Sequence, residues 1–344
     1  YTQAMALKHD FGIAMANRSY LLLNRQEFKR GWSLYDGTRN SELGAKPAYP
    51  TEAVRWEGSS LRGKNIQVYA TQGVGDEILF SSCIPDLIQE SPNKIYLECD
   101  SRLEPLFARS FPEVIVYGVV RSSQALKTRN NGAKLIEDVN FDYSIPIDGL
   151  PRFFGNKIED FPSRDAFLVP DPKSVDKWEK RLGDLGEGLK IGISWLGGAP
   201  KFYDKNSIPL DHWKDLLSVD AFFVNLQYGN TSDEVEKFSI ENNITIHDWE
   251  DNNASLDLDN QAALISELDL VISVDNATVH SCVALGTEVW DLIDPSLNFM
   301  WMENGTGISP LSQNLRFFKR GNQDSWGTVL SYAEEQLRER INPA

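Results

Sequence analysis

The spacing of apolar residues changes along the chain. Over residues 1–36 apolar side chains recur every three to four positions, as on one face of a helix. From residue 64 onward, short apolar runs alternate with stretches of helical period. Strands that alternate with helices are typical of parallel βαβ units. The pattern therefore predicts two N-terminal helices, interrupted around residues 17–19, followed by an α/β protein.

The short apolar runs form two series. The first series predicts strands at 65–70, 94–98, 114–118 and 141–146, and the second at 189–195, 221–227, 244–247, 270–274, 288–292 and 315–319. Between them, residues 151–187 hold several prolines and a charged helix, which is typical of an inter-domain passage. We predict two Rossmann-like, doubly wound domains. The predicted limits are 1–36 for a helical extension, 37–170 and 171–322 for the two domains, and 323–344 for a last helix.

Composition and charge narrow the class of protein. With 344 residues, 41% hydrophobic and 24% charged, the chain has the composition of a folded protein with two cores. Its net charge of -16 disfavours sequence-independent binding to nucleic acid or to an anionic membrane, because both require clustered Lys and Arg. We therefore expect no nucleic-acid partner.

Cysteine usage and hydropathy indicate the cellular compartment of the protein. Cys83, Cys99 and Cys282 are widely spaced and form neither a disulfide framework nor a zinc pattern, which favours a reducing, cytoplasmic location. No apolar run approaches the roughly 18 residues of a membrane-spanning helix, so we expect no transmembrane segment.

The first candidate site is the turn 73–76, which directly follows the first strand. Glycines such as Gly75 allow a tight turn and close approach of a ligand, while the next helix presents N–H groups. The segment is neither GxGxxG nor a P-loop, so dinucleotide or NTP binding is not indicated. Alternatively, Gly75 only serves the turn and Asp76 only sits favourably in the first turn of the helix.

A second candidate lies where a buried strand runs into a helix, at Asp275, Asn276, Ala277, Thr278 and His280. Small residues at this helix start leave N–H groups accessible, and the Thr278 hydroxyl adds a donor. A helix start of this kind suits a diphosphate, because the dipole and the N–H donors both favour an anion. The alternative is ordinary capping by an Asp or Asn side chain, with the histidine in the core.

A third candidate is the strand-end segment that contains Trp195 and a Gly pair. Lys201 and Lys205 follow it and could reach a phosphate as point charges. Gln227, at the end of the next strand, could bond a ribose or a base. The alternatives are a surface loop with solvated lysines and a polar strand-end residue.

Other patterns point to no metal or cofactor. The acidic run 248–259 lacks the spacing of a calcium loop and is interpreted as a solvated loop. The remaining histidines show no metal-ligand spacing, and no GxSxG elbow occurs.

Several segments together resemble a known family. They are FKRGWSLYDGTR, RWEGSSLRGKNIQVYATQGVGDEILFSS, GLPRFFGNKIEDFP, IGISWLGGAP, KNSIPL, FFVNLQ and LDLVISVDNATVHSCVALGTEVWDL. In this order, over residues 28–326, the chain resembles the heptosyltransferase-like family 9 glycosyltransferase domain found at the C-terminus of bacterial tetratricopeptide-repeat proteins.

The resemblance implies a GT-B fold, in which the C-terminal domain takes a nucleotide-sugar donor and the N-terminal domain a glycan or protein acceptor. The last helix would cross back to the N-terminal domain. Transfer would be inverting and metal-independent, with Asp76 as general base, and the sugar nucleotide would be a substrate, with no further cofactor. The donor diphosphate would lie at 275–280 and, less directly, at Lys201 and Lys205. The N-terminal helices would be the tail of a repeat array and could bind a protein partner.

The chain also departs from the family. Family members often read WSGNP or WAGNP before a basic stretch, and VDTAVAH at the donor motif, whereas this chain reads WLGGAPKFYDKNS and VDNATVH. These differences leave the donor open. They also keep two alternatives: a non-catalytic nucleotide- or carbohydrate-binding module, and a sugar-nucleotide epimerase.

Overall fold

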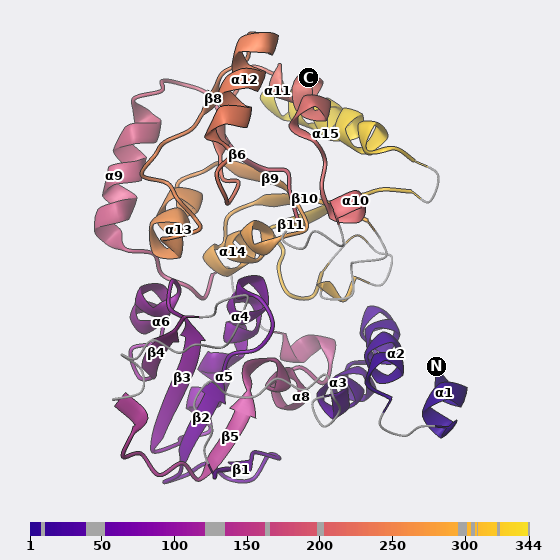
Figure 1. Cartoon of the computed structure of the whole chain (residues 1–344), viewed down its shortest axis with the longest axis vertical. Helices are drawn as coiled ribbons and strands as arrows, with labels where there is room; N and C mark the ends of the chain where they lie inside the picture. The colour runs from indigo at the N-terminus through magenta and orange to yellow at the C-terminus, as the bar shows by residue number, and fades with distance from the viewer. Residues whose placement is uncertain are drawn as a thin grey trace. The chain divides into compact units, whose positions relative to one another are not determined.

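The structure is a computed structural model of the chain. It describes residues 1–7, 11–38, 52–120, 135–161, 166–197, 203–294, 301–303, 307, 309–321 and 324–342. The chain divides into two compact units, each with its own sheet (Figure 1). Unit 1 comprises Tyr1–Ser163 and Phe299–Leu311, and unit 2 comprises Arg164–Asn298 and Ser312–Ala344.

Unit 1 is built on a five-stranded parallel sheet in the order β1-β5-β2-β3-β4. Its strands are β1 (Val54–Arg55), β2 (Asn65–Tyr69), β3 (Lys94–Asp100), β4 (Ile115–Val119) and β5 (Tyr143–Pro146). Its helices include α1 (Thr2–Leu7), α2 (Gly12–Asn24), α3 (Phe28–Gly37), α4 (Val74–Phe80), α5 (Ile84–Gln89), α6 (Glu104–Ser110) and α8 (Pro151–Phe154), with a 3-10 turn η3 (Ile147–Gly149). The central strands are buried almost throughout, which explains their near-continuous apolar runs.

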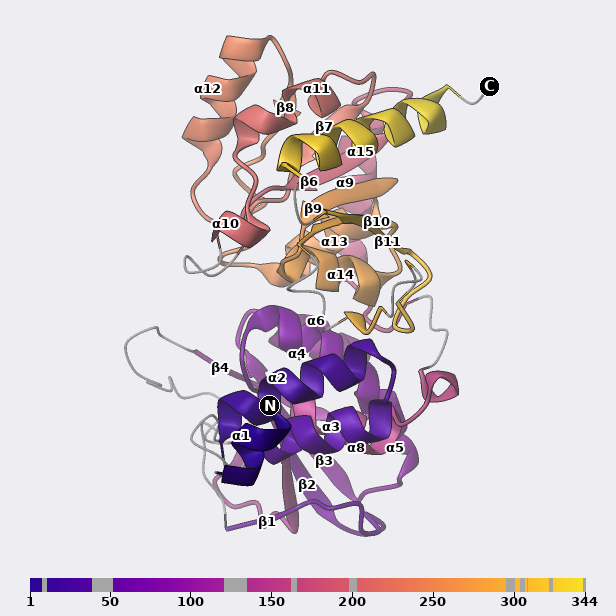
Figure 2. The ribbon, with the colours of Figure 1, turned by 90° about the vertical axis from the view of Figure 1, so that its right-hand side faces the viewer.

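The N-terminal helices belong to unit 1, where α2 and α3 lie side by side (Figure 2). Trp32 of α3 contacts the ring of Phe80 in α4, with centroids 6.1 Å apart. The predicted interruption at residues 17–19 is wrong: α2 runs through it, and the Ser19 hydroxyl is satisfied by donating to the Ala16 carbonyl at 2.7 Å. The chain turns instead at Gln26, whose φ is 56°. Helix α3 is thus part of the unit 1 core, and a repeat-like origin of these helices stays a prediction.

Unit 2 repeats the design with a six-stranded parallel sheet in the order β11-β10-β9-β6-β7-β8. Its strands are β6 (Lys190–Ser194), β7 (Phe222–Asn225), β8 (Ile246–His247), β9 (Leu270–Val274), β10 (Val289–Ile293) and β11 (Leu315–Lys319). Its helices include α9 (Pro172–Gly183), α10 (Tyr203–Asn206), α11 (Lys214–Leu217), α12 (Ser232–Asn242), α13 (Leu258–Ser266), α14 (Ala277–Leu285) and α15 (Trp326–Ile341). Strands β9 and β10 are buried along their whole length.

Side-chain caps set the starts of two of these helices. Asp171 accepts a hydrogen bond from the Ser174 amide at 3.0 Å before α9. Asp257 accepts one from the Asn260 amide at 3.0 Å before α13. Each cap satisfies an N–H group that has no partner within the helix.

The last helix packs on unit 2. Trp326, Leu330 and Leu337 recur at helical spacing on the inner face of α15 and share one buried cluster with strand residues of the unit 2 sheet. The prediction that residues 323–344 cross back to the first domain is therefore corrected, because this apolar stripe is covered by unit 2. Conversely, the contacts of residues 299–311 assign them to unit 1, inside the range predicted for the second domain.

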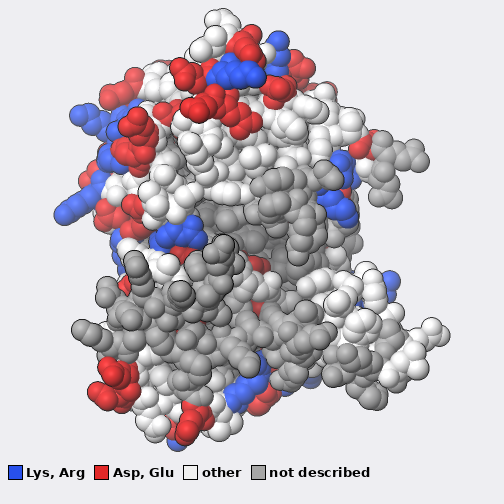
Figure 3. Space-filling view, viewed as in Figure 1, with Lys and Arg blue, Asp and Glu red and all other residues white. Residues whose placement is uncertain are grey.

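Acidic and basic side chains are interspersed over the end of unit 2 that carries α12 (Figure 3). Within the described part of the chain, no helix combines the length and the apolarity needed to cross a bilayer.

Candidate functional site

Both sheets are wound in the same way. Apart from the edge strand β1, which precedes β2 in unit 1, each sheet starts at a central strand (β2 or β6). The chain adds two strands on one side of it and then crosses to its other side, at β5 or β9. Doubly wound sheets bind ligands at such a switch point, beyond the carboxyl ends of the strands. The segments after β2 and β5, and those after β6 and β9, are therefore the places to examine.

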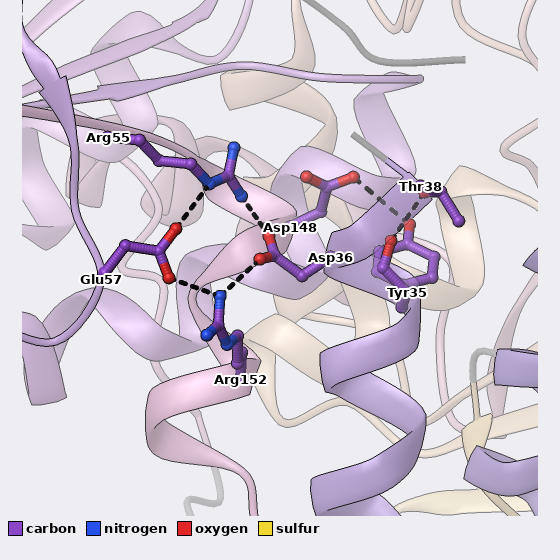
Figure 4. Close-up of polar contacts among 7 residues, drawn as sticks. All are labelled: Tyr35, Asp36, Thr38, Arg55, Glu57, Asp148 and Arg152. Carbon is purple, nitrogen blue, oxygen red and sulfur yellow. Dashed lines mark hydrogen bonds and ion pairs between the residues drawn. The ribbon is translucent and has the colours of Figure 1, made fainter. Parts of the chain in front are cut away.

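In unit 1 a hydrogen-bonded group bridges the switch point. Gln72 follows β2 and Asp148 follows β5, and the Gln72 Nε2 donates to Asp148 Oδ2 at 3.1 Å and also to the Tyr35 hydroxyl. Tyr35 donates to the same Asp148 oxygen at 3.3 Å (Figure 4). Asp148 is only 1% exposed. The backbone of Gln72 has a φ of 60°, which is a strained, left-handed conformation for a residue other than glycine. The hydrogen bonds to Asp148 and Tyr35 hold it in place.

Asp76 lies at the start of α4, four residues after Gln72. It is half-buried, and its Oδ2 accepts a hydrogen bond from the Gly73 amide at 3.0 Å. Gly75 is the second residue of the helix and is also half-buried. Asp76 thus occupies the first turn of the helix, as the alternative interpretation required, and also caps it. The role of Asp76 as a general base stays a prediction.

An ion-pair cluster lies beside this turn (Figure 4). Asp36 of α3 pairs with Arg55 of β1 and, at 2.8 Å, with Arg152 of α8. Glu57 pairs with both arginines, at 3.5 Å and 2.8 Å. The Asp36 side chain is only 7% exposed, whereas that of Glu57 is 55% exposed. The cluster joins three of the segments that carry the family resemblance, and its role is to fasten α3 to the sheet.

In unit 2 the switch point is held by neutral side chains. Gln227 Oε1 accepts three hydrogen bonds, from Ser194 Oγ at 3.0 Å and from the amides of Trp195 and Leu196 at 2.8 Å each. Its Nε2 donates to the Tyr228 carbonyl at 3.3 Å. Gln227 therefore shapes the turn after β6, and its side-chain carbonyl is engaged within the protein.

Asn276 bridges β6 and β9 from the start of α14. Its Oδ1 accepts from the Thr278 amide at 2.9 Å, and its Nδ2 donates to Ser194 Oγ at 2.8 Å and to the Leu196 carbonyl at 3.1 Å. One N–H group of the helix start is thus occupied by a cap. Thr278 is buried, whereas Asp275 and Ala277 are half-buried.

Asp291 was not anticipated from the sequence. It lies on β10 beside Ser273 of β9, is fully buried, and neither of its carboxyl oxygens has a hydrogen-bond partner in the described structure. Burial, and then the nearby Asp275 carboxylate, raise the pKa of Asp291 well above its usual range, so the folded state favours the neutral carboxyl.

The remaining predicted residues are dispersed. Trp195 is fully buried in the unit 2 core, so its ring is not a wall of an open site. His280 is also buried. Lys205 is exposed at the end of α10, and Lys201 lies outside the described residues. Gly197 is required by close packing, because a Cβ there would lie 2.2 Å from the Asn206 side chain.

A polar cavity of about 360 Å³ opens at the carboxyl ends of β7 and β8. It is lined by Asn225, Gln227, Gly229, Asn230, Thr231, Ser232, Asp248, Trp249, Glu250, Asn252, Asn253, Ser255 and Leu256. This volume falls in the range of small-molecule sites. Carboxylates and carboxamides accept hydrogen bonds from hydroxyl and amino groups, and the Trp249 ring offers an apolar surface.

The cavity adds to the interpretation of the acidic run 248–259 as a solvated loop, in which Glu250 and Asp251 are exposed. Asp251 pairs with Arg181 at 2.6 Å and with Lys177 at 3.0 Å. The Arg181 hydrogen bond is the main cause that lowers the pKa of Asp251, Lys177 lowers it further, and burial opposes the shift. Other residues of the run line the cavity. The available signal was a tryptophan followed by neighbouring asparagines directly after a strand.

No protein-family profile matches the chain. The chain is 32% identical over 338 residues to Protein FlbA of Caulobacter vibrioides, an alignment that covers 96% of this chain and 56% of that protein. The chain thus spans little more than half the length of this relative.

Solved structures decide the fold. A family 9 glycosyl transferase from Veillonella parvula matches with a TM-score of 0.61 at 13% identity, covering 81% of this chain and 96% of that one. The E. coli ADP-heptose LPS heptosyltransferase II matches with a TM-score of 0.57 at 14% identity, covering 81% and 98%. The chain has the fold of family 9 glycosyltransferases. The predicted α/β class, with two parallel sheets, is confirmed.

Proposed function

We propose that this chain is a glycosyltransferase that moves a sugar from a nucleotide-diphosphate donor to a hydroxyl acceptor. The observation that carries the proposal is the polar cavity at the carboxyl ends of β7 and β8, on a fold that glycosyltransferases share. The cavity lies in unit 2, which is the unit proposed to take the donor.

The lining of this cavity fits the nucleoside part of a donor. Ribose hydroxyls and base amino groups are hydrogen-bond donors, and Asp248 and Glu250 supply acceptors. Carboxylates would repel a diphosphate, so the phosphates are proposed to lie nearer the start of α14, where helix polarity favours an anion. Lys205, and Lys201, are proposed to contribute positive charge.

The proposed reaction is a single displacement that inverts the anomeric carbon. The acceptor oxygen attacks that carbon, the bond to the nucleotide diphosphate breaks, and Asp76 accepts the proton of the acceptor hydroxyl. General-base catalysis of this kind typically contributes about 10²–10⁴-fold. No metal ion and no further cofactor is part of the proposal, because helix polarity and lysines would stabilise the leaving diphosphate.

Substitution of Asp76 tests the base. Asp76→Asn keeps an oxygen that can accept from the Gly73 amide, so the cap of α4 is retained. We expect turnover to fall by about 10²-fold or more while nucleotide affinity stays unchanged. Asp138→Asn, at an exposed position of unit 1, is the matched control. Near-normal turnover of Asp76→Asn would exclude it as the base.

A thermal-shift screen of UDP-, GDP-, ADP- and CMP-linked sugars tests the donor site. A ligand at 100 times its Kd should stabilise the protein by about 2.7 kcal/mol. Removing a cavity contact by Asn230→Ala or Glu250→Gln should weaken binding of the identified nucleotide about tenfold. Glu241→Gln, exposed on α12, should leave it unchanged. If none of these nucleotides stabilises the protein, the donor assignment fails.

A non-catalytic nucleotide-binding module is the second candidate. The capping contact of Asp76 favours it, because a carboxylate that accepts from the Gly73 amide has a structural role that requires no catalysis. This candidate requires a nucleotide shift in the screen without sugar transfer or donor hydrolysis, and with no difference between the wild type and Asp76→Asn.

A further inference from the structure

Unit 1 contains a cavity of about 610 Å³ that is distinct from both switch points. It lies among α2, α3 and α8 and is lined by Arg18, Leu22, Lys29, Arg30, Ser33, Leu34, Arg152 and Asn156. Half of these residues are cationic and none is acidic, although the chain as a whole carries a net charge of -16. Positive charge gathered in one cavity of an acidic protein attracts an anionic ligand.

Arg152 is held in place at the edge of this cavity. Its Nη1 donates both to Asp36 Oδ2 and to Glu57 Oε2, each at 2.8 Å (Figure 4). Within the described residues, its Nε and Nη2 make no hydrogen bond. The guanidinium is therefore fixed by one nitrogen, with further N–H donors available to a ligand, and a fixed fork loses little entropy when it binds an oxyanion.

The other cations leave the cavity with unneutralised charge. Arg30 pairs with Glu27. Arg18 makes one weak polar contact in the described structure, from its Nη1 to the sulfur of Met5 at 3.9 Å. Lys29 makes no polar contact in that same part of the chain. Two cations without a carboxylate partner match an oxyanion with a double negative charge.

We propose that this cavity binds a phosphate monoester with a polar body of about the size of a sugar. Arg18, Lys29 and the free edge of Arg152 would hold the phosphate, and Ser33 and Asn156 would hydrogen-bond the polar body. The volume is within the range of sites that enclose small ligands. The proposal does not rest on the proposed function, since none of these residues belongs to either switch point or to the polar cavity of unit 2.

Local chemical protection tests the proposal with glucose 6-phosphate as the probe. Lys29 and Lys237 are both exposed, and their acylation rates in the full chain can be followed by mass spectrometry. We expect saturating glucose 6-phosphate to slow acylation of Lys29 about tenfold or more, and to leave Lys237 of unit 2 unchanged. Neutral glucose at the same concentration is the control for the phosphate.

Substitutions provide the second measurement. Arg18→Gln combined with Lys29→Gln should weaken binding of glucose 6-phosphate, measured by calorimetry, about tenfold or more, and Lys29→Gln alone should also weaken it. Lys237→Gln should bind as the wild type does. Equal rates at Lys29 with and without the probe, equal protection by glucose, or unchanged affinity of Lys29→Gln would each overturn the proposal. Failure of the nucleotide screen would leave it untouched.

Discussion

The two switch points have the same topology but are held by different chemistry. In unit 1 the buried carboxylate of Asp148 receives donors from Gln72 and from Tyr35 of α3. In unit 2 the carboxamides of Gln227 and Asn276 bond to backbone and hydroxyl groups of the turn after β6. A carboxylate only accepts, whereas a carboxamide both donates and accepts.

This difference determines which elements each switch point depends on. The carboxamides of unit 2 satisfy groups on adjacent strand ends without any outside donor. The carboxylate of unit 1 requires donors from elsewhere, and one comes from a helix 113 residues earlier in the sequence. The N-terminal helices therefore stabilise the turn that carries Asp76, whereas the unit 2 site is complete within its own sheet and the connections of that sheet.

We expect the largest loss of stability when the side-chain carboxamide of Gln227 is removed from unit 2. Gln227→Ala removes the acceptor of two backbone amides, one of them buried, and should lower the free energy of unfolding by about 3 kcal/mol. Urea unfolding followed by tryptophan fluorescence measures this. Gln261→Ala is the control, because that buried glutamine donates to one carbonyl, that of Leu226. If both variants lost the same free energy of unfolding, the argument that Gln227 matters because two backbone amides share its oxygen would be contradicted.

The buried carboxyl of Asp291 should make the stability of unit 2 depend on pH. Its pKa is raised in the folded protein, so the folded state keeps a proton that the unfolded chain loses near pH 4. This contribution to stability is complete below pH 4 and declines as the pH rises toward the folded pKa, by about 1.4 kcal/mol per pH unit.

Asp291→Asn removes this titration. Unfolding at pH 5, 6, 7 and 8 should show the variant gaining stability relative to the wild type with each step until the folded pKa is reached. The contributions of groups that do not interact with Asp291 cancel in the difference. Parallel pH profiles of the two proteins would mean that Asp291 is already ionised in the fold.

Unit 1 should be sensitive to loss of a buried charge. Asp36→Asn leaves Arg55 and Arg152 without their buried partner and should lower the free energy of unfolding by about 2 kcal/mol. Glu57→Gln, in the same cluster but 55% exposed, should change it by about 0.5 kcal/mol or less. Urea unfolding of both variants provides the test, and a larger loss for Glu57→Gln would refute the buried-charge argument.

The smallest expected loss of stability comes from a substitution in α3 that tests whether the unit 1 switch point depends on this helix. Tyr35→Phe removes one donor to Asp148 and should lower the free energy of unfolding by about 1 kcal/mol. Thermal unfolding and the turnover of the variant are the measurements, because a displaced turn would also move Asp76. Tyr332→Phe, with an exposed hydroxyl contact to Arg316, is the control and should match the wild type.

Local patterns in the sequence were sufficient to predict the strands of both sheets except β1, a two-residue edge strand without an apolar run. Apolar runs located the strands, since buried parallel strands require them on both faces. The capping alternative for Asn276 was also predictable, because caps depend on neighbours in sequence. The donor-binding and catalytic roles stay predictions.

Contacts between distant segments were not predictable in this way. Nothing local to Tyr35 indicates that it meets Asp148, and the apolar context of Asp291 does not reveal a carboxyl with no partner. The apolar side chains at helical spacing in α15 indicated that one face of this helix is buried, but not that unit 2 covers that face. Such pairings depend on tertiary packing, which a single sequence encodes only collectively.

Tyr35 and Asp36 are consecutive residues of α3, and they face different tasks. Tyr35 is hydrogen-bonded to Gln72, directly before the glycine turn that bears Asp76, and Asp36 pairs with Arg152 at the edge of the cavity that Arg18 and Lys29 also line. Because successive side chains of a rigid helix move as one body, a displacement of α3 cannot alter one attachment and spare the other. A ligand of the proposed kind that displaced α3 on entering the cavity would therefore also move the turn that bears Asp76.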